Sequence, residues 1–421
     1  MSRRAWLAGA AATTACSSLA RQTVAATPQP VKPKSVAAVL TAYEHGLHAD
    51  VLIGKILEGW KQDGGAGPAL ELAAMYVEQF TDRDMARSMS QKHGVPIFET
   101  IEQAVTVGGE HIPVDGVISV GEHGNYPSNN KGQTLYPRRR FFEAITDAFR
   151  KYDKVVPVFS DKHLGPVWSD AKWMYDRAIA MKVPFMAGSS MTVGYREPHI
   201  EIRPDCEVEA AVGIGYSGLD IYGSHALEFF QCHVERRQGA EVGVKWVQCL
   251  HGDAMWKVLD EGVVRQDMFD AALAQVPHES GDVRHSNEST LFLFRYTDGL
   301  MGAVFMLPDF ARGTSVALKL KEKNEIQGTR FDERTEPRHP HFAWLLKGIE
   351  KMIHTDRATY PVERTLLTSG ILDRALTSRA TGQRKLLTPE LEIQYHPVDY
   401  PHAPDPDLNS RPDQGVNSVR R

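Results

Sequence analysis

Cysteine is scarce in this chain, and the patterns that mark a disulfide framework or a metal site are missing. Four cysteines occur among 421 residues, with no C-x-x-C pair and no H-E-x-x-H sequence, so no disulfide framework or zinc site is readable. An excess of positive charge is also absent, because the formal net charge is −5. A chain with this charge balance lacks the electrostatic footprint of a nucleic-acid-binding surface, and we expect no nucleic-acid partner.

Long apolar runs are missing as well. The apolar part of MSRRAWLAGAAATTACSSLARQTVAA (1–26) is too short for a stable anchor, so we expect no transmembrane segment in the mature chain. Arg3 and Arg4, followed by an aromatic residue and a leucine, resemble a twin-arginine export signal; the alternative is a basic start with no targeting role. We predict a signal peptide over 1–26, a linker over 27–35 and a periplasmic or otherwise exported protein. A lipid anchor at Cys16 is not expected, because the leucine of a lipoprotein cleavage box is missing.

From residue 36 the chain alternates between short apolar segments and amphipathic ones. Strands are predicted at 36–43, 70–77, 95–98, 114–121, 155–160 and 183–188, and helices at 48–60, 82–94, 101–107, 138–151 and 168–182. Apolar strands separated by helices are typical of a parallel sheet that is covered on both faces. We therefore predict an α/β fold that begins with a doubly wound, Rossmann-like domain over 36–190.

After residue 190 the pattern changes to strands in succession. They are predicted at 207–216, 242–252, 289–296, 300–307 and 315–321, with a helix at 224–237 and a hairpin turn at TDGL (297–300). Strands joined by short turns favour an antiparallel sheet, so we predict an α+β open-sheet C-terminal domain over 191–400. Helices at 341–354 and 361–382, the second with Pro361 in its first turn, and a flexible tail over 401–421 complete the chain.

Several local sequences, in this order, resemble the Gfo/Idh/MocA family of oxidoreductases. DKHLG (161–165) stands where the family carries Glu-Lys-Pro-Leu, and GLDIYGSHALEFF (218–230) is similar to its Asp-Ile-Gly-x-His-x-x-Asp passage. The stretch 74–105 and the two closing helices also follow the family's order, so the resemblance covers roughly residues 36–390. It implies the two-domain fold predicted above and an oxidoreductase that acts on a sugar, cyclitol or related polyol with a tightly held nicotinamide cofactor.

The resemblance breaks at the turn after the first strand, where the family has a glycine-rich sequence. Here the turn reads TAYEHGLHAD (41–50), with Gly46 as its only glycine, and glycines let the backbone approach a pyrophosphate. If a dinucleotide is bound, we expect Tyr43, Gly46, Glu78 and Glu122 to line its site. Glu78 follows the second strand, where an acid accepts hydrogen bonds from a ribose, so NAD is favoured over NADP. An exposed acid at a strand end is the other interpretation of Glu78.

Three residues are candidates for catalysis. Lys162 stands at the position of the family's catalytic lysine, and at the carboxyl end of a strand it could orient a hydroxyl group or relay its proton. His225 suits proton transfer because its ordinary pKa is near neutral, and Asp220 precedes it by five residues where the family's acid precedes by four. The alternatives are a solvated lysine, a histidine that bonds the helix start and an acid turned away from the site.

A long polar loop, GEHGNYPSNNKGQTLYPRRRFF (121–142), follows the fourth predicted strand and suits the hydroxyl groups of a sugar. We predict that His123 and Tyr126 of this loop, together with His163, contact the substrate. Arg138–Arg140 could bind an acidic group, but we interpret them as the solvated first turn of a helix.

A second function stays open, namely a family-derived protein that has lost NAD(P) binding. Such a protein would bind carbohydrate without turnover, or act as a sugar lyase or isomerase through acid–base or metal chemistry. A divalent metal could be held by a cluster drawn from His45, His48, Glu122, His123, His163 and His225. No diagnostic spacing supports that cluster, so no metal site is assigned. With either function we expect a small carbohydrate or polyol as partner and a homo-oligomer built on the open sheet.

Overall fold

The structure, a computed structural model, describes residues 31–403. The predicted signal peptide, residues 27–30 of the predicted linker and most of the predicted tail lie outside these residues. Contacts place the described chain from Pro33 onward in one compact unit. Each helix within the described range is too short or too polar to cross a membrane.

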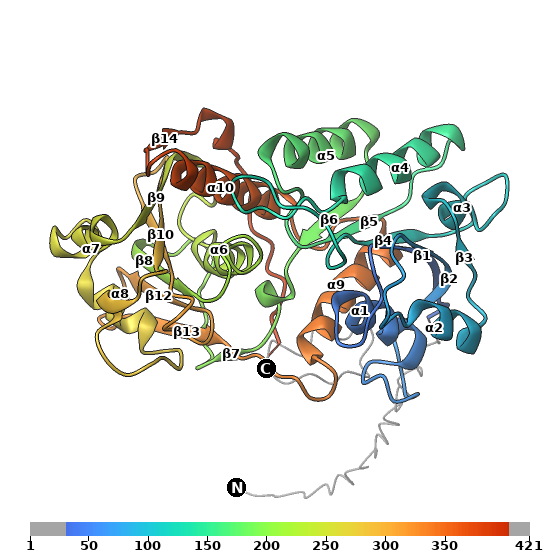
Figure 1. The fold of residues 1–421 in the computed structure, drawn as a ribbon, viewed down its shortest axis with the longest axis horizontal. Coiled ribbons are helices and arrows are strands. Elements are labelled where there is room, and N and C mark those ends of the chain that lie inside the picture. Colours follow the sequence, from blue (N-terminus) through green and yellow to red (C-terminus); the bar gives the residue numbers. More distant parts are fainter. Residues whose placement is uncertain (1–30, 404–421) are drawn as a thin grey trace, which may run out of the picture. The chain divides into compact units, whose positions relative to one another are not determined.

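A six-stranded sheet organises the N-terminal half (Figure 1). Its strand order is β3-β2-β1-β4-β5-β6, and each neighbouring pair is parallel. The strands are β1 (Lys34–Leu40), β2 (Leu70–Val77), β3 (Ile97–Phe98), β4 (Gly116–Val120), β5 (Val158–Asp161) and β6 (Phe185–Gly188). The doubly wound fold predicted from the sequence is thereby confirmed.

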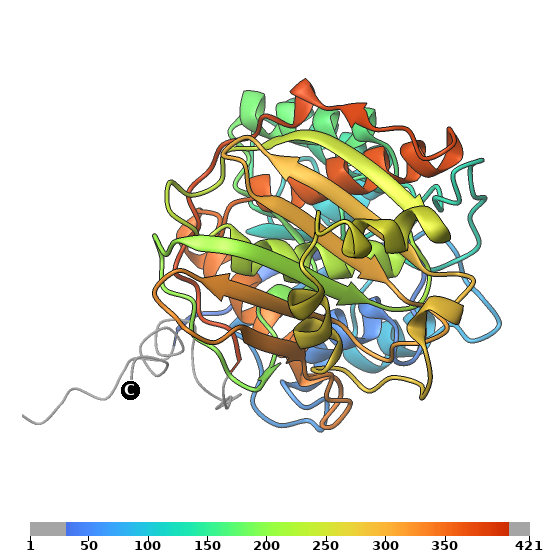
Figure 2. The ribbon, with the colours of Figure 1, turned by 90° about the vertical axis from the view of Figure 1, so that its left-hand side faces the viewer.

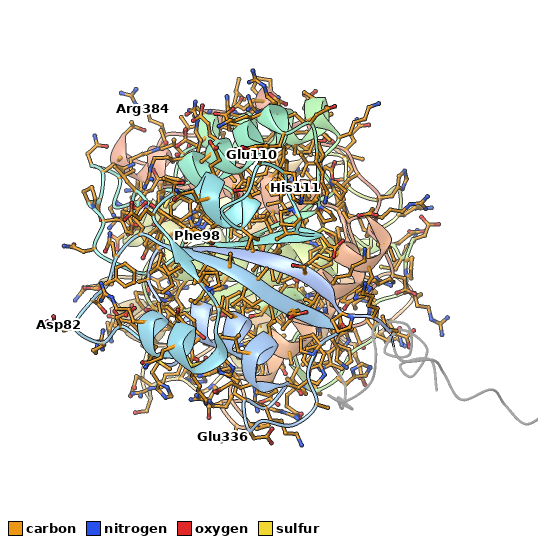
Figure 3. All side chains as sticks on the ribbon, turned by 90° about the vertical axis from the view of Figure 1, so that its right-hand side faces the viewer. Asp82, Phe98, Glu110, His111, Glu336 and Arg384 are labelled. Atoms are coloured by element: carbon orange, nitrogen blue, oxygen red, sulfur yellow. The ribbon has the colours of Figure 1, made fainter. Side chains whose placement is uncertain are left out.

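Helices cover this sheet on both faces, which is why its strands are apolar throughout. Figure 3 views the sheet from the side of β3, where Phe98 is labelled, with helices above and below the strands. One face packs against α1 (His48–Glu58), α2 (Ala86–His93) and α9 (Pro340–Thr355). The other packs against α3 (Ile101–Thr106), α4 (Arg138–Lys151) and α5 (Trp168–Met181). Helix α9 comes from the late part of the chain and returns to the first sheet, where Leu345 and Ile349 are fully buried.

An eight-stranded mixed sheet forms the second half, with the order β14-β9-β10-β11-β8-β12-β13-β7 (Figure 2). Its strands are β7 (Arg196–Glu197), β8 (Val208–Gly215), β9 (Val244–His251), β10 (Thr290–Tyr296), β11 (Met301–Met306), β12 (Ser315–Leu320), β13 (Gln327–Phe331) and β14 (Leu386–Leu387). One face packs on α6 (Ile221–Val234) and α10 (Glu363–Ala380). The opposite face carries α7 (Asp253–Asp260) and α8 (Gln266–Leu273). The open-sheet α+β half is therefore also confirmed.

The structure differs from the sequence prediction in several details of this second half. Strand β12 pairs with β8 and not with β11, and the β8–β11 pair is parallel, so the sheet is mixed. Helix α6 begins three residues before the predicted start, and α10 begins at Glu363, so Pro361 precedes the helix instead of lying in its first turn. The short helices α7 and α8 lie between β9 and β10 and add to the elements predicted for this half.

Candidate functional site

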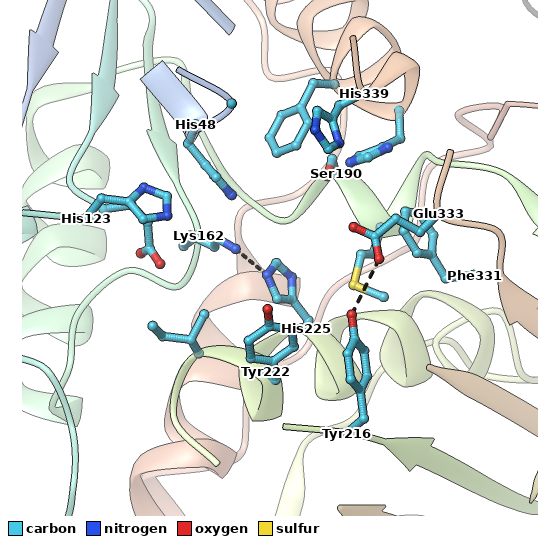
Figure 4. A pocket seen from close by; sticks show the side chains of 16 residues that line it. His48, His123, Lys162, Ser190, Tyr216, Tyr222, His225, Phe331, Glu333 and His339 are labelled. Carbon is cyan, nitrogen blue, oxygen red and sulfur yellow. Dashed lines mark hydrogen bonds between the residues drawn. The ribbon is translucent and has the colours of Figure 1, made fainter. Parts of the chain in front are cut away.

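A pocket of about 320 Å³ lies where the carboxyl ends of β1, β4 and β5 face helix α6 (Figure 4). This is the edge at which open α/β sheets bind ligands. Five histidines line the pocket: His48, His123, His225, His339 and His341. Burial is the largest cause that lowers the pKa of each of them, so these imidazoles are neutral at pH 7.

Lys162 and His225 meet in this pocket, although they are 63 residues apart in the sequence. The Lys162 Nζ and the His225 Nε2 are in hydrogen-bond contact, drawn as a dashed line in Figure 4. Lys162 is only 3% exposed, and burial lowers its pKa against the opposing effect of Glu122 and Asp161. Burial and the Lys162 charge both lower the pKa of His225. The roles predicted for the two residues stay predictions, but their side chains converge as those roles require.

Ser189 holds the other side of the His225 ring. Its Oγ lies 2.6 Å from the His225 Nδ1 and accepts a hydrogen bond from the Met191 N–H at 3.2 Å. With this hydroxyl as acceptor for an Nδ1–H, the imidazole presents its unprotonated Nε2 to the pocket. Ser189 was not predicted, because a serine after a buried strand carries no signal of its own.

The turn that carries Ser189 depends on a close approach at Gly188. This glycine has φ of +121°, and a Cβ there would lie 2.7 Å from the Thr365 Oγ1 and 2.8 Å from the Glu228 Oε1. Glu228 accepts hydrogen bonds from Thr365 and from the Ser189 N–H, and burial raises its pKa. Only glycine fits at this junction, so β6, α6 and α10 are joined behind the Lys162–His225 pair.

Asp161, the residue before Lys162, points to a different partner. Its Oδ2 lies 2.6 Å from the His48 Nδ1 at the start of α1, while its buried Oδ1 has no partner among the described residues. Burial raises the pKa of Asp161 to about 6. His48 also packs against the His123 ring at a centroid distance of 5.2 Å. The predicted substrate residue His123 therefore lies in the pocket, on the side of β1 and β4.

Glu122 and Arg138 form a buried ion pair next to the pocket. Their side chains are 1% and 0% exposed, and the Arg138 guanidinium also lies 3.1 Å from the His163 Nε2. The interpretation of Arg138 as a solvated residue is wrong, because Arg138 faces inward to neutralise Glu122; Arg139 and Arg140 are partly exposed. His163 is held behind Arg138 and is not among the residues that line the pocket, whereas Glu122 is.

The turn between β1 and α1 is built around Asp50. Gly46, with φ of +74°, donates its N–H to the Asp50 Oδ2 at 2.8 Å, and a Cβ at Gly46 would meet no atom within 4 Å. The Arg338 guanidinium lies 3.8 Å from the same carboxylate. Tyr43 does not face this turn, because its ring is fully buried in the core beside α1. Gly46 thus borders open space, and the negative charge of Asp50 is compensated within the chain.

Three further predicted residues lie away from the pocket. The Tyr126 hydroxyl donates to Glu78 at 2.7 Å, and Arg140 pairs with the same carboxylate, so Tyr126 and Glu78 are partners beyond the end of β2. Asp220 accepts the Thr134 N–H at 2.9 Å, and its pKa is raised by burial to about 6. Neither Tyr126 nor Asp220 lines the pocket.

The second half of the chain supplies pocket residues that the sequence did not reveal. Tyr216 follows β8 and Tyr222 belongs to α6, and the Tyr216 hydroxyl lies 3.4 Å from the Glu333 Oε2. Phe342 packs its ring on His48 at a centroid distance of 4.7 Å. Glu333 and Phe342 belong to the segment that leads back to the first sheet, and this return could not be read from local sequence. Among residues 31–403, no three His, Cys, Asp or Glu side chains form a group suited to a metal ion.

Comparison with known proteins shows the fold at low sequence identity. No protein family and no curated protein matches the sequence, but solved structures do. GenD2 from gentamicin A biosynthesis, in complex with NAD, is 14% identical with a TM-score of 0.53, over 85% of this chain and 97% of that one. The apo scyllo-inositol dehydrogenase from Lactobacillus casei is 10% identical, with a TM-score of 0.51 over 82% and 96%. The WlbA dehydrogenase from Bordetella pertussis, in complex with NADH and UDP-GlcNAcA, is 11% identical, with a TM-score of 0.50 over 86% and 99%. This chain shares the two-domain fold of these dehydrogenases.

Proposed function

We propose that this chain is an oxidoreductase of the Gfo/Idh/MocA type that oxidises a hydroxyl group of a neutral sugar or cyclitol with a tightly held NAD. The observation that carries the proposal is the contact between Lys162 and His225 in a pocket at the carboxyl edge of the first sheet. The shared fold supports it, since the similar structures include inositol dehydrogenases and complexes with NAD and NADH.

The pocket favours a neutral substrate. Among residues 31–403, Lys162 is the only lysine or arginine that lines it, and two glutamates, Glu122 and Glu333, line it as well. A phosphorylated or acidic sugar would need more positive charge than one lysine supplies. Hydroxyl groups both donate and accept hydrogen bonds, which matches a lining of neutral imidazoles, carboxylates, Tyr216 and Tyr222. We therefore infer an uncharged polyol as the substrate class.

The residues present fit a nicotinamide dinucleotide in three places. Gly46 borders open space at the start of α1, and Arg338 lies beside that turn, where it also compensates Asp50. Glu78, which pairs with Arg140, follows β2 at the position of a ribose-binding acid. When bound, the nicotinamide supplies the hydride acceptor. Because Asp50 already takes the Gly46 N–H, the backbone contributes less to pyrophosphate binding than a glycine-rich turn would.

The protein's own residues then handle the proton. We infer that the substrate hydroxyl enters between the Lys162 Nζ and the His225 Nε2, where the ammonium donates a hydrogen bond to the hydroxyl oxygen. As the C–H bond breaks, the hydroxyl proton passes to the unprotonated Nε2 of His225. Ser189 accepts the Nδ1–H and so keeps the imidazole in the tautomer that can take this proton.

Native mass spectrometry of the full chain, purified from a host that exports through the twin-arginine pathway, tests the proposal. We expect a non-covalent adduct with the mass of NAD, and reduction of that bound NAD when a neutral cyclitol or sugar is added. Lys162→Met should keep the adduct and lose the reduction, while Lys172→Met, an exposed lysine on α5 paired with Asp176, should keep both. Purified protein that neither carries nor takes up NAD would refute the redox proposal.

A second function is favoured by one observation: the Gly46 N–H already donates a hydrogen bond to Asp50 and is not free for a pyrophosphate. If the dinucleotide is not bound, the same pocket with Lys162, His225, His48 and Asp161 would serve a sugar lyase or isomerase through acid–base chemistry, or would bind carbohydrate without turnover. Turnover of a sugar by protein shown to be free of NAD, without net oxidation, would establish this alternative.

Export and assembly complete the proposal. We propose a periplasmic protein on the basis of Arg3 and Arg4 and the apolar residues that follow. Fusing residues 1–35 to a reporter, with Arg3→Lys/Arg4→Lys as the control, should show export that depends on the arginine pair.

We also propose a homo-oligomer built on the open sheet, which size-exclusion chromatography with light scattering would test.

A further inference from the structure

A second cavity, of about 570 Å³, lies apart from the pocket that holds Lys162 and His225, and the two share no lining residue. It is bordered by residues 192–204, by the C-terminal end of α6, by the start of α10 and by residues 398–402. The proposed oxidation uses none of the residues around this cavity.

Three arginines line the cavity, and two of them have a carboxylate partner. Arg364 donates through its Nε to Glu235 at 2.8 Å and forms a second bond to the same carboxylate. Arg236 pairs with Asp399 at 3.1 Å. The charges of these two arginines are thus matched inside the chain.

Arg196, the third arginine, has no carboxylate within ion-pair distance among residues 31–403. One of its terminal nitrogens donates to the Thr192 carbonyl at 3.2 Å and lies 3.7 Å from the Cys232 Sγ. Its Nε is shielded from solvent and has no hydrogen-bond partner in the described part of the chain. Burial lowers the pKa of Arg196, but a guanidinium stays protonated at neutral pH because its ordinary pKa is above 12. Arg196 as a whole is half-buried, so its positive charge is partly shielded from water and lacks a counter-ion within the described residues.

A second unpartnered atom lies at the same cavity. The Nδ1 of His402 is buried and has no hydrogen-bond partner within residues 31–403, and burial lowers the pKa of this histidine to about 2, so the ring is neutral. His402 packs on His199, which also lines the cavity, at a centroid distance of 5.0 Å. One further carboxylate, that of the exposed Glu201, also lines the cavity. The Arg196 guanidinium and the His402 imidazole nitrogen are the two groups that the cavity offers to an anionic ligand.

We propose that this cavity is a binding site for a small oxyanion, a phosphate or carboxylate group, held by the Arg196 guanidinium. An oxyanion accepts hydrogen bonds from the free N–H groups of the arginine and supplies the counter-charge that the guanidinium lacks. The cavity has room for a larger molecule that carries such a group. The site is independent of the proposed dehydrogenase activity, and its test needs no turnover.

Isothermal titration calorimetry and thermal unfolding of the full chain, in a buffer free of oxyanions, test the site. Inorganic phosphate and malonate are compared with chloride at equal ionic strength, which separates a phosphate from a carboxylate preference. We expect saturable binding of at least one of them and an increase in Tm of about 2 °C at 10 mM. Equal Tm values in chloride, phosphate and malonate would overturn the proposal.

Three variants locate the site. Arg196→Gln should raise the Kd at least tenfold and remove the anion-dependent rise in Tm, while Arg196→Lys, which keeps the charge, should retain part of that rise. Arg203→Gln removes an exposed arginine that does not line this cavity and should bind like the unmodified chain. If Arg196→Gln and Arg196→Lys both bind with unchanged Kd, the anion is held elsewhere and the assignment is wrong. The Tm of each variant in chloride alone shows whether that variant folds normally. A folding defect is thereby distinguished from a loss of anion binding.

Discussion

Arg138 and Arg139 are adjacent in the sequence, and the structure predicts that replacing them has very different consequences. Arg138 is 0% exposed and pairs with Glu122, which is 1% exposed. Arg139 is 39% exposed and pairs with Asp170 at 2.9 Å, at the surface of α4. Arg138→Gln leaves the Glu122 carboxylate buried without a counter-charge, whereas Arg139→Gln releases a carboxylate that water solvates.

The loss in free energy of unfolding that each substitution causes depends on how deeply its ion pair is buried. Removing one partner of a buried ion pair costs about 3–5 kcal/mol, and a partly exposed pair contributes about 0–1 kcal/mol. Arg138 also lies 3.1 Å from the His163 Nε2, so Arg138→Gln should fall at the upper end of the first range. Because the pKa of Glu122 is lowered in the folded state by Arg138 and Lys162, against the effect of burial, the pair stabilises the protein at neutral pH. This stabilisation is lost as the pH falls through the lowered pKa.

Urea unfolding, followed by circular dichroism at pH 7, measures the free energy of unfolding of each variant. The double variant Glu122→Gln/Arg138→Gln should recover much of the loss, because it leaves no unpaired charge in the interior. Equal losses of 1 kcal/mol or less for Arg138→Gln and Arg139→Gln would show that Glu122 is solvated or neutral, and would refute this assignment of the buried pair.

Three further changes address the pocket and its supports. Lys162→Met should lower kcat/KM for the polyol by about 10²–10⁴-fold, measured as reduction of bound or added NAD, whereas Lys172→Met should leave it unchanged. Ser189→Ala should lower kcat roughly tenfold and move the acid limb of the pH–rate profile to lower pH, because the imidazolium of His225 loses an acceptor for its Nδ1–H; an unchanged profile would argue against the tautomer assigned here. The pKa of Asp161 is raised to about 6 by burial, so the folded state binds more protons than the unfolded state between about pH 4 and pH 6, and stability falls as the pH rises through that window. Asp161→Asn should therefore reduce the fall in free energy of unfolding between pH 4 and pH 6, as measured by urea titrations at several pH values.

The first sheet could be predicted strand by strand because local signals and tertiary structure agree there. Each of its strands is a short apolar run between helices, and a fully covered parallel sheet requires that composition. For the second sheet, only the fold class, an open α+β sheet, could be predicted. That β12 pairs with β8 depends on how separate hairpins dock, and local sequence does not encode this pairing. The return of α9 to the first sheet is a long-range event of the same kind.

The residues of the site could be predicted where they lie in turns that follow the carboxyl ends of strands. Lys162, His123 and Gly46 lie at the carboxyl edge because they belong to the turns that follow β5, β4 and β1. Asp220 and Tyr126 were misplaced because their side chains found partners in neighbouring loops, in Thr134 and Glu78. Side-chain partners within loops have no sequence signature, since they depend on where two irregular segments touch.

The polar triplet Asp161-Lys162-His163 shows how backbone geometry decides what the sequence leaves open. In a regular strand Asp161 and His163 would share one face and Lys162 would take the other. Lys162 instead has φ of +67°, a conformation that is rare for a residue with a side chain. Asp161 consequently reaches α1 through His48, Lys162 reaches α6 through His225, and His163 reaches α4 through Arg138. Strain of this kind persists where surrounding contacts hold it, and here three helices do so around one strand end. Lys162→Gly should therefore relieve the backbone strain yet abolish the contact with α6. A Lys162→Gly variant as stable as the parent or more so but without turnover, with the free energy of unfolding measured in urea, would identify the strain as stored for function.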